Sequence, residues 1–312
     1  MRVLVTGVSG FVGCRLAPYL VSRGHEVTGT FIHEVPPLDE VETVEVDLLD
    51  DERLVRIFER TEPEAVVHLA GLSHVGESWK RPAEYFQVNV LGSRNVMRSA
   101  AGARVLVASS AEVYGAVPEA EQPISELRPV APQSPYAMTK AAMELLALER
   151  GAIVVRSFNI VGPGQADTFA LPAFANQLAA IGRKTSEGEL RVGNLCAKRD
   201  FVHVGDAVEA IAMVLETGRP GEIYNLGSGR AESIDSVLQK LIAISGLSPE
   251  VIVDPERFRP VDVPLLQADR SRLSELGWSP NRGLDAALQD LWEFALSQTS
   301  DTRDEDAKPS NG

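Results

Sequence analysis

The feature that most limits how this chain can fold is its first apolar strand and the glycine-rich turn that follows. Residues 2–6 are mostly apolar, and glycines recur at three-residue spacing directly after them, before a helical pattern. Glycines let the backbone approach a phosphate closely, and a helix N-terminus directs N–H groups and a positive dipole at it. The turn is therefore expected to bind the pyrophosphate of a dinucleotide cofactor. The residues expected to contact it are Gly7, Gly10, Phe11, Val12 and Gly13.

Strand and helix patterns alternate along most of the chain. The segments expected as strands include 25–31, 44–48, 65–71 and 105–108, and helical patterns at 52–60 and 83–99 lie between them. This alternation predicts an α/β fold with a doubly wound, mostly parallel Rossmann sheet. That domain is expected to span 1–165, completed by about 200–228, beside a smaller mixed α/β substrate lobe of 166–199 and 229–297. The polar, acidic segment 298–312 is expected to be a disordered tail.

A proton donor is expected on a helix near residue 136. Tyr136 and Lys140 stand four residues apart and so share one helix face. The ammonium of Lys140 is expected to lower the pKa of the Tyr136 phenol, which can then exchange a proton with a carbonyl oxygen. Ser110 ends the preceding strand, where its hydroxyl can donate a hydrogen bond to the same oxygen. Together they predict a Ser-Tyr-Lys catalytic group, although Tyr-x-x-x-Lys spacing also occurs by chance on exposed helices.

The strand ends that follow the glycine turn indicate where the rest of the cofactor would lie. Asp47, next to Leu48, is placed either to receive the adenine amino group or to cap a helix. The strand ending in Leu69, Ala70 and Gly71 offers small residues against which a cofactor can lie. The second strand ends without the acidic residue that binds a ribose 2′-hydroxyl in NAD sites, so NADP(H) is favoured and NAD(H) is the alternative.

The net charge of −14 excludes a broadly basic surface, and with it nucleic acid as a partner. No apolar run approaches the roughly 20 residues that span a bilayer, and the chain begins with a strand rather than a leader peptide. A cytoplasmic protein without membrane contact is therefore expected. Cys14 and Cys196 are far apart and lack histidine neighbours at ligand spacing, so neither a disulfide nor a metal site is expected. An anionic ligand then needs a local positive cluster, for which Arg199 and Arg259 are the preferred pair.

Three motifs together resemble the extended short-chain dehydrogenase/reductase family. They are Gly7-x-x-Gly10-x-x-Gly13, Ser109-Ser110-Ala111-Glu112-Val113-Tyr114-Gly115 and Tyr136-x-x-x-Lys140. The resemblance covers nearly the whole chain. It implies that Tyr136 transfers the proton, that Ser110 is the catalytic hydroxyl and that Lys140 holds the nicotinamide ribose, so that Tyr136 and Lys140 are both expected among the cofactor contacts. It also implies that paired helices form a homodimer.

Later motifs are similar to the GDP-mannose branch of that family. They are Arg156-Ser157-Phe158-Asn159-Ile160-Val161-Gly162-Pro163-Gly164-Gln165, Val192-Gly193-Asn194-Leu195 with Arg199-Asp200-Phe201, and Arg259-Pro260-Val261-Asp262-Val263-Pro264. The resemblance implies NAD(P)H-dependent reduction of the C4 ketone of a GDP-linked 4-keto-6-deoxy-hexose. The residues expected at the substrate are Ser73, Ser110, Glu112, Asn159, Asn194, Arg199 and Arg259, with Glu112 also catalytic.

Other functions remain open within this resemblance. A GDP-mannose 4,6-dehydratase shares the Glu112 position, an epimerase would keep its nicotinamide bound, and a reductase could yield the talose rather than the rhamnose product. A dinucleotide sensor without catalysis is a further class. The short segment between residues 30 and 42 favours the reductase, because the dehydratase typically carries a longer, basic segment there.

Overall fold

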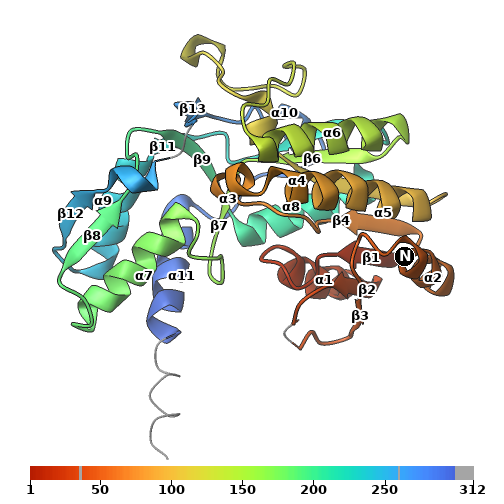
Figure 1. Ribbon diagram of the computed structural model, residues 1–312, viewed down its shortest axis with the longest axis horizontal. Helices are drawn as coiled ribbons and strands as arrows, with labels where there is room; N and C mark the ends of the chain where they lie inside the picture. The colour runs from red at the N-terminus through yellow and green to blue at the C-terminus, as the bar shows by residue number, and fades with distance from the viewer. Residues whose placement is uncertain (35–36, 259–260, 299–312) are drawn as a thin grey trace, which may run out of the picture.

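A large parallel sheet forms the middle layer of the larger part of the molecule, on the right in Figure 1. The computed structural model describes residues 1–34, 37–258 and 261–298. Across the described residues, the sheet order is β10 (Ile223–Leu226), β6 (Ile153–Ser157), β5 (Arg104–Ser110), β4 (Ala65–His68), β1 (Arg2–Thr6), β2 (Glu26–Phe31) and β3 (Val41–Glu45). The order reverses at β1, which pairs in parallel with both β2 and β4. The expected doubly wound α/β class is confirmed.

Helices cover both faces of this sheet because alternate residues of each strand point to opposite sides. On β1, Val3 and Val5 pack with one set of helices, whereas Leu4 packs with another. The first set contains α1 (Gly13–Ser22) and α8 (Val204–Thr217). The opposite face carries α2 (Asp51–Thr61), α4 (Pro82–Phe86), η1 (Gln87–Gly92), α5 (Ser93–Ser99) and α6 (Pro135–Glu149).

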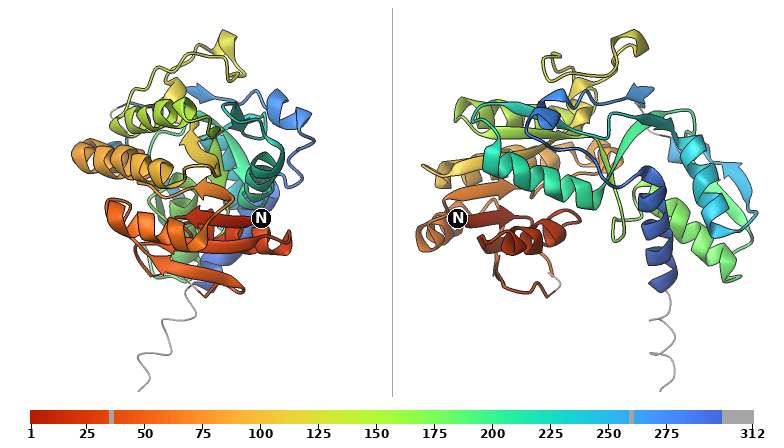
Figure 2. Two further views of the ribbon diagram at one scale, coloured as in Figure 1. Left: turned by 90° about the vertical axis from the view of Figure 1, so that its right-hand side faces the viewer. Right: turned by 180° about the vertical axis from the view of Figure 1, so that it is seen from behind.

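A second hydrophobic core is formed by elements that lie to one side of the large sheet, and the rear view in Figure 2 shows these elements. Its helices are α7 (Ala170–Gly182), α9 (Ile234–Ser245) and α11 (Leu284–Ser297), which pack with β8 (Glu189–Val192) and its parallel partner β12 (Glu250–Val253). A mixed sheet of β7 (Asn159–Val161), β9 (Lys198–His203), β11 (Ala231–Ser233) and β13 (Leu265–Leu266) lies between the two cores. The expected lobe boundaries stay a prediction.

The remaining elements are short. They are α3 (Val75–Lys80), η2 (Ala111–Tyr114), η3 (Glu119–Glu121), η4 (Pro255–Arg257) and α10 (Ser271–Glu275). Within the described residues, no helix is both long and apolar enough to cross a membrane. The same residues offer no group of three or more His, Cys, Asp or Glu side chains that could hold a metal.

Two sequence-based expectations need correction. The segment 44–48 was expected as a strand, but β3 is Val41–Glu45, and Val46 and Leu48 are buried after the strand has ended. Val46 still donates its N–H to the Phe31 carbonyl of β2 at 2.7 Å, and the apolar spacing of the two residues also reflects their burial. The helix expected at 83–99 is interrupted by η1, a π-helical turn between α4 and α5. The predicted contact Arg259 and residues 299–312 of the predicted tail lie outside the described residues.

The second core makes a quantitative prediction. Leu178 on α7 is fully buried there, so Leu178→Ala is expected to lower the free energy of unfolding by about 3 kcal/mol through the cavity it leaves. Leu127, which is 80% exposed, is the matched control, and Leu127→Ala should change the free energy of unfolding by less than about 0.5 kcal/mol. Urea titration measures both values, and equal stability of the two variants would contradict this assignment of the core.

Candidate active site

The glycine turn after β1 forms a narrow backbone cradle. Gly7 has a φ of +75°, and a Cβ there would lie 2.8 Å from the backbone N and Cα of Ala70. A Cβ at Gly13 would come within 2.2 Å of the Gly7 carbonyl oxygen. No side chain among the described residues caps the first turn of α1. The N–H groups and the helix dipole therefore face the cradle, which fits the pyrophosphate of a dinucleotide cofactor.

The other predicted cofactor contacts lie at the ends of β4 and β3. Leu69 and Ala70 follow β4, and their N–H groups donate to the Thr6 carbonyl at 3.2 Å and the Thr6 hydroxyl at 3.3 Å. Asp47 is exposed, and its carboxylate accepts the Leu49 N–H at 2.9 Å, so it shapes the turn before α2. Their contact with a cofactor stays a prediction, as do those of Gly71 and Leu48.

Helix α6 carries the predicted proton donor and lysine on its buried face. Ser134 caps the helix by accepting the Ala137 N–H at 3.1 Å, with Pro135 in the first turn. Tyr136 and Lys140 are 7% and 6% exposed. Both side chains meet β5, because Tyr136 shares a hydrogen bond with Ser110 and Lys140 Nζ donates to the Ala108 carbonyl at 2.8 Å. The structure therefore brings Ser110, Tyr136 and Lys140 together.

Burial raises the pKa of Tyr136, which corrects the expectation that Lys140 lowers it. Burial is the largest effect, the charge of Glu112 adds to it, and together they outweigh the hydrogen bond with Ser110, which lowers this pKa. Burial also lowers the pKa of Lys140 to about 8, against an opposing effect of Glu144. Tyr136 is thus a protonated phenol at neutral pH, which is the state that a proton donor requires.

Glu144, one helical turn after Lys140, forms a buried ion pair with Arg156 of β6. The two groups approach to 2.7 Å with each side chain 4% exposed, and Ser109 also donates to the Glu144 carboxylate. The Arg156 guanidinium lies 4.7 Å from the centre of the Tyr114 ring. These contacts fix α6 against β5 and β6, and so fix the position of Lys140.

His68, the last residue of β4, is a buried and neutral histidine that is hydrogen-bonded through both ring nitrogens. Its Nδ1 lies 2.7 Å from Thr6 Oγ1, and its Nε2 lies 2.8 Å from Ser93 Oγ. Ser93 gives its own proton to the Asn89 carbonyl at 2.6 Å, so His68 Nε2 donates to Ser93 and Nδ1 accepts from Thr6. Burial, with a smaller effect of the Lys140 charge, lowers the pKa of His68 to about 3.

Asn89, in the middle of η1, connects the end of β4 to the catalytic helix. Its side-chain oxygen accepts the Leu72 N–H at 2.8 Å, and its amide donates to the Leu72 carbonyl and to Thr139 Oγ1, each at 3.0 Å. A Cβ at Gly71 would lie 2.8 Å from the Asn89 oxygen. The loop after β4, which is expected to lie against the cofactor, is therefore held by the uncharged amide of Asn89.

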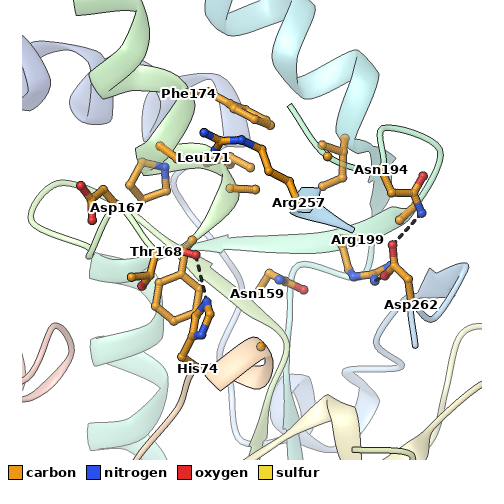
Figure 3. A pocket seen from close by; sticks show the side chains of 18 of the residues that line it. His74, Asn159, Asp167, Thr168, Leu171, Phe174, Asn194, Arg199, Arg257 and Asp262 are labelled. Atoms are coloured by element: carbon orange, nitrogen blue, oxygen red, sulfur yellow. Dashed lines mark hydrogen bonds and ion pairs between the residues drawn. The ribbon is translucent and has the colours of Figure 1, made fainter. Parts of the chain in front are cut away.

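A cavity of about 600 Å³ lies between α3 and the elements of the second core (Figure 3). As far as the described residues go, its lining does not include Ser110, Tyr136 or Lys140. Tyr85 connects the two places, since its hydroxyl donates to the His74 carbonyl at 2.6 Å and its ring meets Tyr136 edge-on, with 6.4 Å between centroids. The cavity is therefore the candidate substrate site next to the proton donor.

Three of the predicted substrate residues, Asn159, Asn194 and Arg199, line this cavity. The Arg199 guanidinium pairs with Asp262 at 2.6 Å, and Asn194 donates to the other oxygen of the same carboxylate at 2.6 Å. The carboxylate of Asp262 thus offsets the positive charge of Arg199, which the sequence analysis expected to bind a diphosphate. The other predicted positions, Ser73 in the loop before α3 and Glu112 beside Ser110, lie outside the lining formed by the described residues. All of these assignments stay predictions.

Sequence reasoning missed several residues that line the cavity, among them His74, Asp167 and Arg257. His74 lies in the loop after β4, so the rule that ligands bind at the carboxyl ends of parallel strands could have identified it. Arg257 pairs with Asp254 at 3.5 Å in η4, and Asp167 is exposed in the loop before α7. Neither position has a local pattern that distinguishes it from a surface loop.

Comparison with known proteins agrees with this geometry. A family model described as GDP-mannose 4,6 dehydratase matches residues 4–291. The chain therefore belongs to the GDP-mannose 4,6-dehydratase family of extended short-chain dehydrogenase/reductases, and the predicted resemblance is confirmed. It is an enzyme of the nucleotide-sugar reductase and epimerase kind.

Individual relatives span nearly the whole chain. GDP-6-deoxy-D-mannose reductase of Pseudomonas aeruginosa is 35% identical over 95% of this chain and 99% of that protein. The structure of RMD from Pseudomonas aeruginosa complexed with NADPH is similar with a TM-score of 0.85 and 31% identity, covering 96% of this chain and 100% of that one. The UDP-glucose 4-epimerase of Thermus thermophilus in complex with NAD has a TM-score of 0.84 and 30% identity, over 95% and 99% of the two chains.

The buried His68 predicts a pH dependence of stability. The unfolded chain takes up a proton at His68 near pH 6.5, whereas the folded protein does so only near pH 3. The free energy of unfolding should therefore fall as the pH drops below 6.5, by at most about 1.4 kcal/mol per pH unit from this group. Denaturant titrations between pH 8 and pH 4.5 should show a weaker fall in His68→Gln, and parallel curves for the two proteins would contradict the neutral assignment.

Proposed function

We propose that this chain reduces the C4 ketone of GDP-4-dehydro-6-deoxy-D-mannose to GDP-D-rhamnose with NADPH. The observation that carries the proposal is the Ser110, Tyr136 and Lys140 group on the carboxyl edge of the sheet, in a chain 35% identical to a GDP-6-deoxy-D-mannose reductase over nearly its full length. NADPH is favoured because β2 ends without an acidic residue and because a similar solved structure holds NADPH. NADH is the alternative, since the Thermus relative holds NAD.

The chain's own groups account for the proton transfer. The cradle of Gly7, Gly10 and Gly13 would hold the cofactor, which supplies the hydride when bound. Tyr136 gives its phenolic proton to the C4 oxygen, and the Ser110 hydroxyl donates a hydrogen bond to the same oxygen. Lys140 keeps a positive charge close to the tyrosinate that forms. Its location under the Ala108 carbonyl also suits a contact with the nicotinamide ribose.

The cavity beside α3 would hold the GDP part of the substrate. Asn159, Asn194 and Arg199 line it, and Arg259 is predicted to add a second guanidinium for the diphosphate. Ser73 and Glu112 are predicted to contact the hexose. Glu112 lies beside Ser110, because its backbone N–H donates a hydrogen bond to the Ser110 hydroxyl. A negatively charged protein can bind this dianion because the charges near the cavity, rather than the net charge, set the local potential.

A dehydratase acting on GDP-mannose is the second candidate, because the matching family model bears that description. It would expel water from GDP-mannose and regenerate its own cofactor, so it needs no added NADPH. The reductase instead consumes one NADPH for each ketone. Incubation with GDP-mannose alone and with GDP-4-dehydro-6-deoxy-D-mannose plus NADPH or NADH distinguishes the two, and the C4 configuration of the product distinguishes rhamnose from talose.

The assignment of Tyr136 makes the next prediction. Tyr136→Phe should lower kcat for the 4-keto sugar by about 10²- to 10⁴-fold, because the C4 oxygen loses its proton donor. NADPH binding, followed by its fluorescence, should weaken by no more than about tenfold, because Tyr136 is also an expected cofactor contact and Phe removes a single hydroxyl. The matched control is Tyr19→Phe on α1, which should keep full turnover. A Tyr136→Phe enzyme with most of its kcat at saturating substrate would refute the role of Tyr136.

We also propose that the chain forms a homodimer through α4, η1 and α6. Large apolar side chains are exposed there, namely Met138 and Leu145 on α6 and Phe86 and Leu91 on the adjoining elements. Met138 and Leu145 are seven residues apart and so share one helix face. A second copy of the same surface would cover them as a self-complementary contact.

The dimer is testable by sedimentation velocity. Leu145 is 72% exposed, so Leu145→Glu should preserve the fold but halve the sedimenting mass, because a charge would be buried in the interface. Leu127→Glu, in the loop before α6, should leave the mass at that of the wild type. A monomeric wild-type protein, or a dimeric Leu145→Glu variant, would count against this interface.

A further inference from the structure

His74 connects the catalytic domain to the chain segment that borders the substrate cavity. It stands in the loop between β4 and α3, and its ring lies beside Thr168 at the end of segment 163–169, which leads into α7 (Figure 3). Its Nε2 lies 3.1 Å from the Thr168 carbonyl oxygen. The ring also meets Phe169 edge-on, with 5.8 Å between centroids and 78° between planes. One side chain thus makes both a polar and an aromatic contact with the cavity wall.

Both nitrogens of the His74 ring are engaged, which fixes its orientation. A carbonyl oxygen only accepts hydrogen bonds, so Nε2 carries the proton that is donated to Thr168. Nδ1 accepts the Glu77 N–H at 3.0 Å and so caps the N-terminus of α3. The ring cannot turn without losing one of the two hydrogen bonds.

The backbone of His74 is fixed relative to the proton donor. Tyr85 donates its hydroxyl hydrogen to the His74 carbonyl, and the Tyr85 ring lies against Tyr136. Leu72 and Val75, on either side of His74, pack with the same two tyrosines. The Thr168 carbonyl, which is hydrogen-bonded to the His74 ring, is therefore fixed in position relative to Tyr136.

The N-terminal end of segment 163–169 is hydrogen-bonded to α1, the helix that follows the glycine cradle. Arg15, in the first turn of α1, donates to the Pro163 carbonyl and, at 2.8 Å, to the Phe11 carbonyl. Between these attachments, Gln165, Asp167 and Thr168 line the cavity. Arg15 and His74 thus hold the two ends of one cavity wall, and His74 is the attachment on the side of the proton donor.

We propose that His74 is a positioning residue for the substrate. Its hydrogen bond to Thr168 holds segment 163–169 in the form that binds the nucleotide sugar with its C4 beside Tyr136. The inference rests on the proposed function in assuming that a nucleotide sugar occupies the cavity. A wall held before binding does not have to be ordered by the substrate, so losing the hydrogen bond weakens binding of ground state and transition state alike, which raises KM more than it lowers kcat.

Two variants separate this role from the capping of α3. Asn in place of His74 keeps an acceptor near Nδ1 and is a good N-cap, but it has no atom near Thr168. Gln places an amide near Nε2 and loses the capping acceptor. We expect His74→Asn to raise KM about five- to tenfold with kcat nearly unchanged, as the loss of one hydrogen bond predicts. His74→Gln should restore KM to within about twofold of wild type while lowering Tm.

Hydrogen exchange of residues 163–169 in the free protein gives a readout that needs no substrate. Exchange measured by mass spectrometry should be faster in His74→Asn than in wild type and His74→Gln. Unchanged exchange in His74→Asn, or a KM in that variant equal to wild type, overturns the proposal, as does a His74→Gln variant impaired more than His74→Asn. If the wild-type protein reduces no GDP-linked 4-keto sugar, the proposed function fails, while the exchange comparison still decides whether His74 holds the wall.

Discussion

The close approach of the chain after β1 to the chain after β4 is the constraint on which the site depends. At this point the strand order reverses, and the backbones of Gly7 and Ala70 meet with no room for a side chain at residue 7. The surface presented to a ligand is therefore backbone N–H and helix dipole rather than side chain. Ser110 ends β5 of the same sheet, and Tyr136 lies on α6, which packs against β5.

Burial determines how charge is distributed around α6. The Glu144 carboxylate is compensated by Arg156, and burial keeps His68 neutral between two hydroxyl partners. Lys140 is bonded to a carbonyl instead of a carboxylate, so its positive charge is not cancelled by that partner. A charge in such a weakly polarisable region acts strongly on a neighbouring anion. In the proposed function the lysine would favour the tyrosinate that forms during proton transfer, whereas burial keeps the phenol of the free protein protonated.

The sequence was most informative where the chemistry depends on residues close together in the chain. The glycine spacing, the order of strands and helices, and the shared face of Tyr136 and Lys140 follow from local patterns. The pKa of Tyr136 depends on burial that several elements produce together, so helix spacing alone pointed in the wrong direction. The cavity is formed by loops distant in sequence, and this is why Arg199 was found without its partner Asp262 and His74 was not singled out.

The π-helical turn η1 has a consequence for how this chain can vary in length. Such a turn contains one residue more than the α-helical turn it replaces, and one residue corresponds to about 100° of rotation. Tyr85 before the turn and Val96 after it are both buried. Deleting any one residue between them would rotate one half of the helix against the other. The number of residues in this segment is therefore more tightly constrained than the identity of its exposed ones.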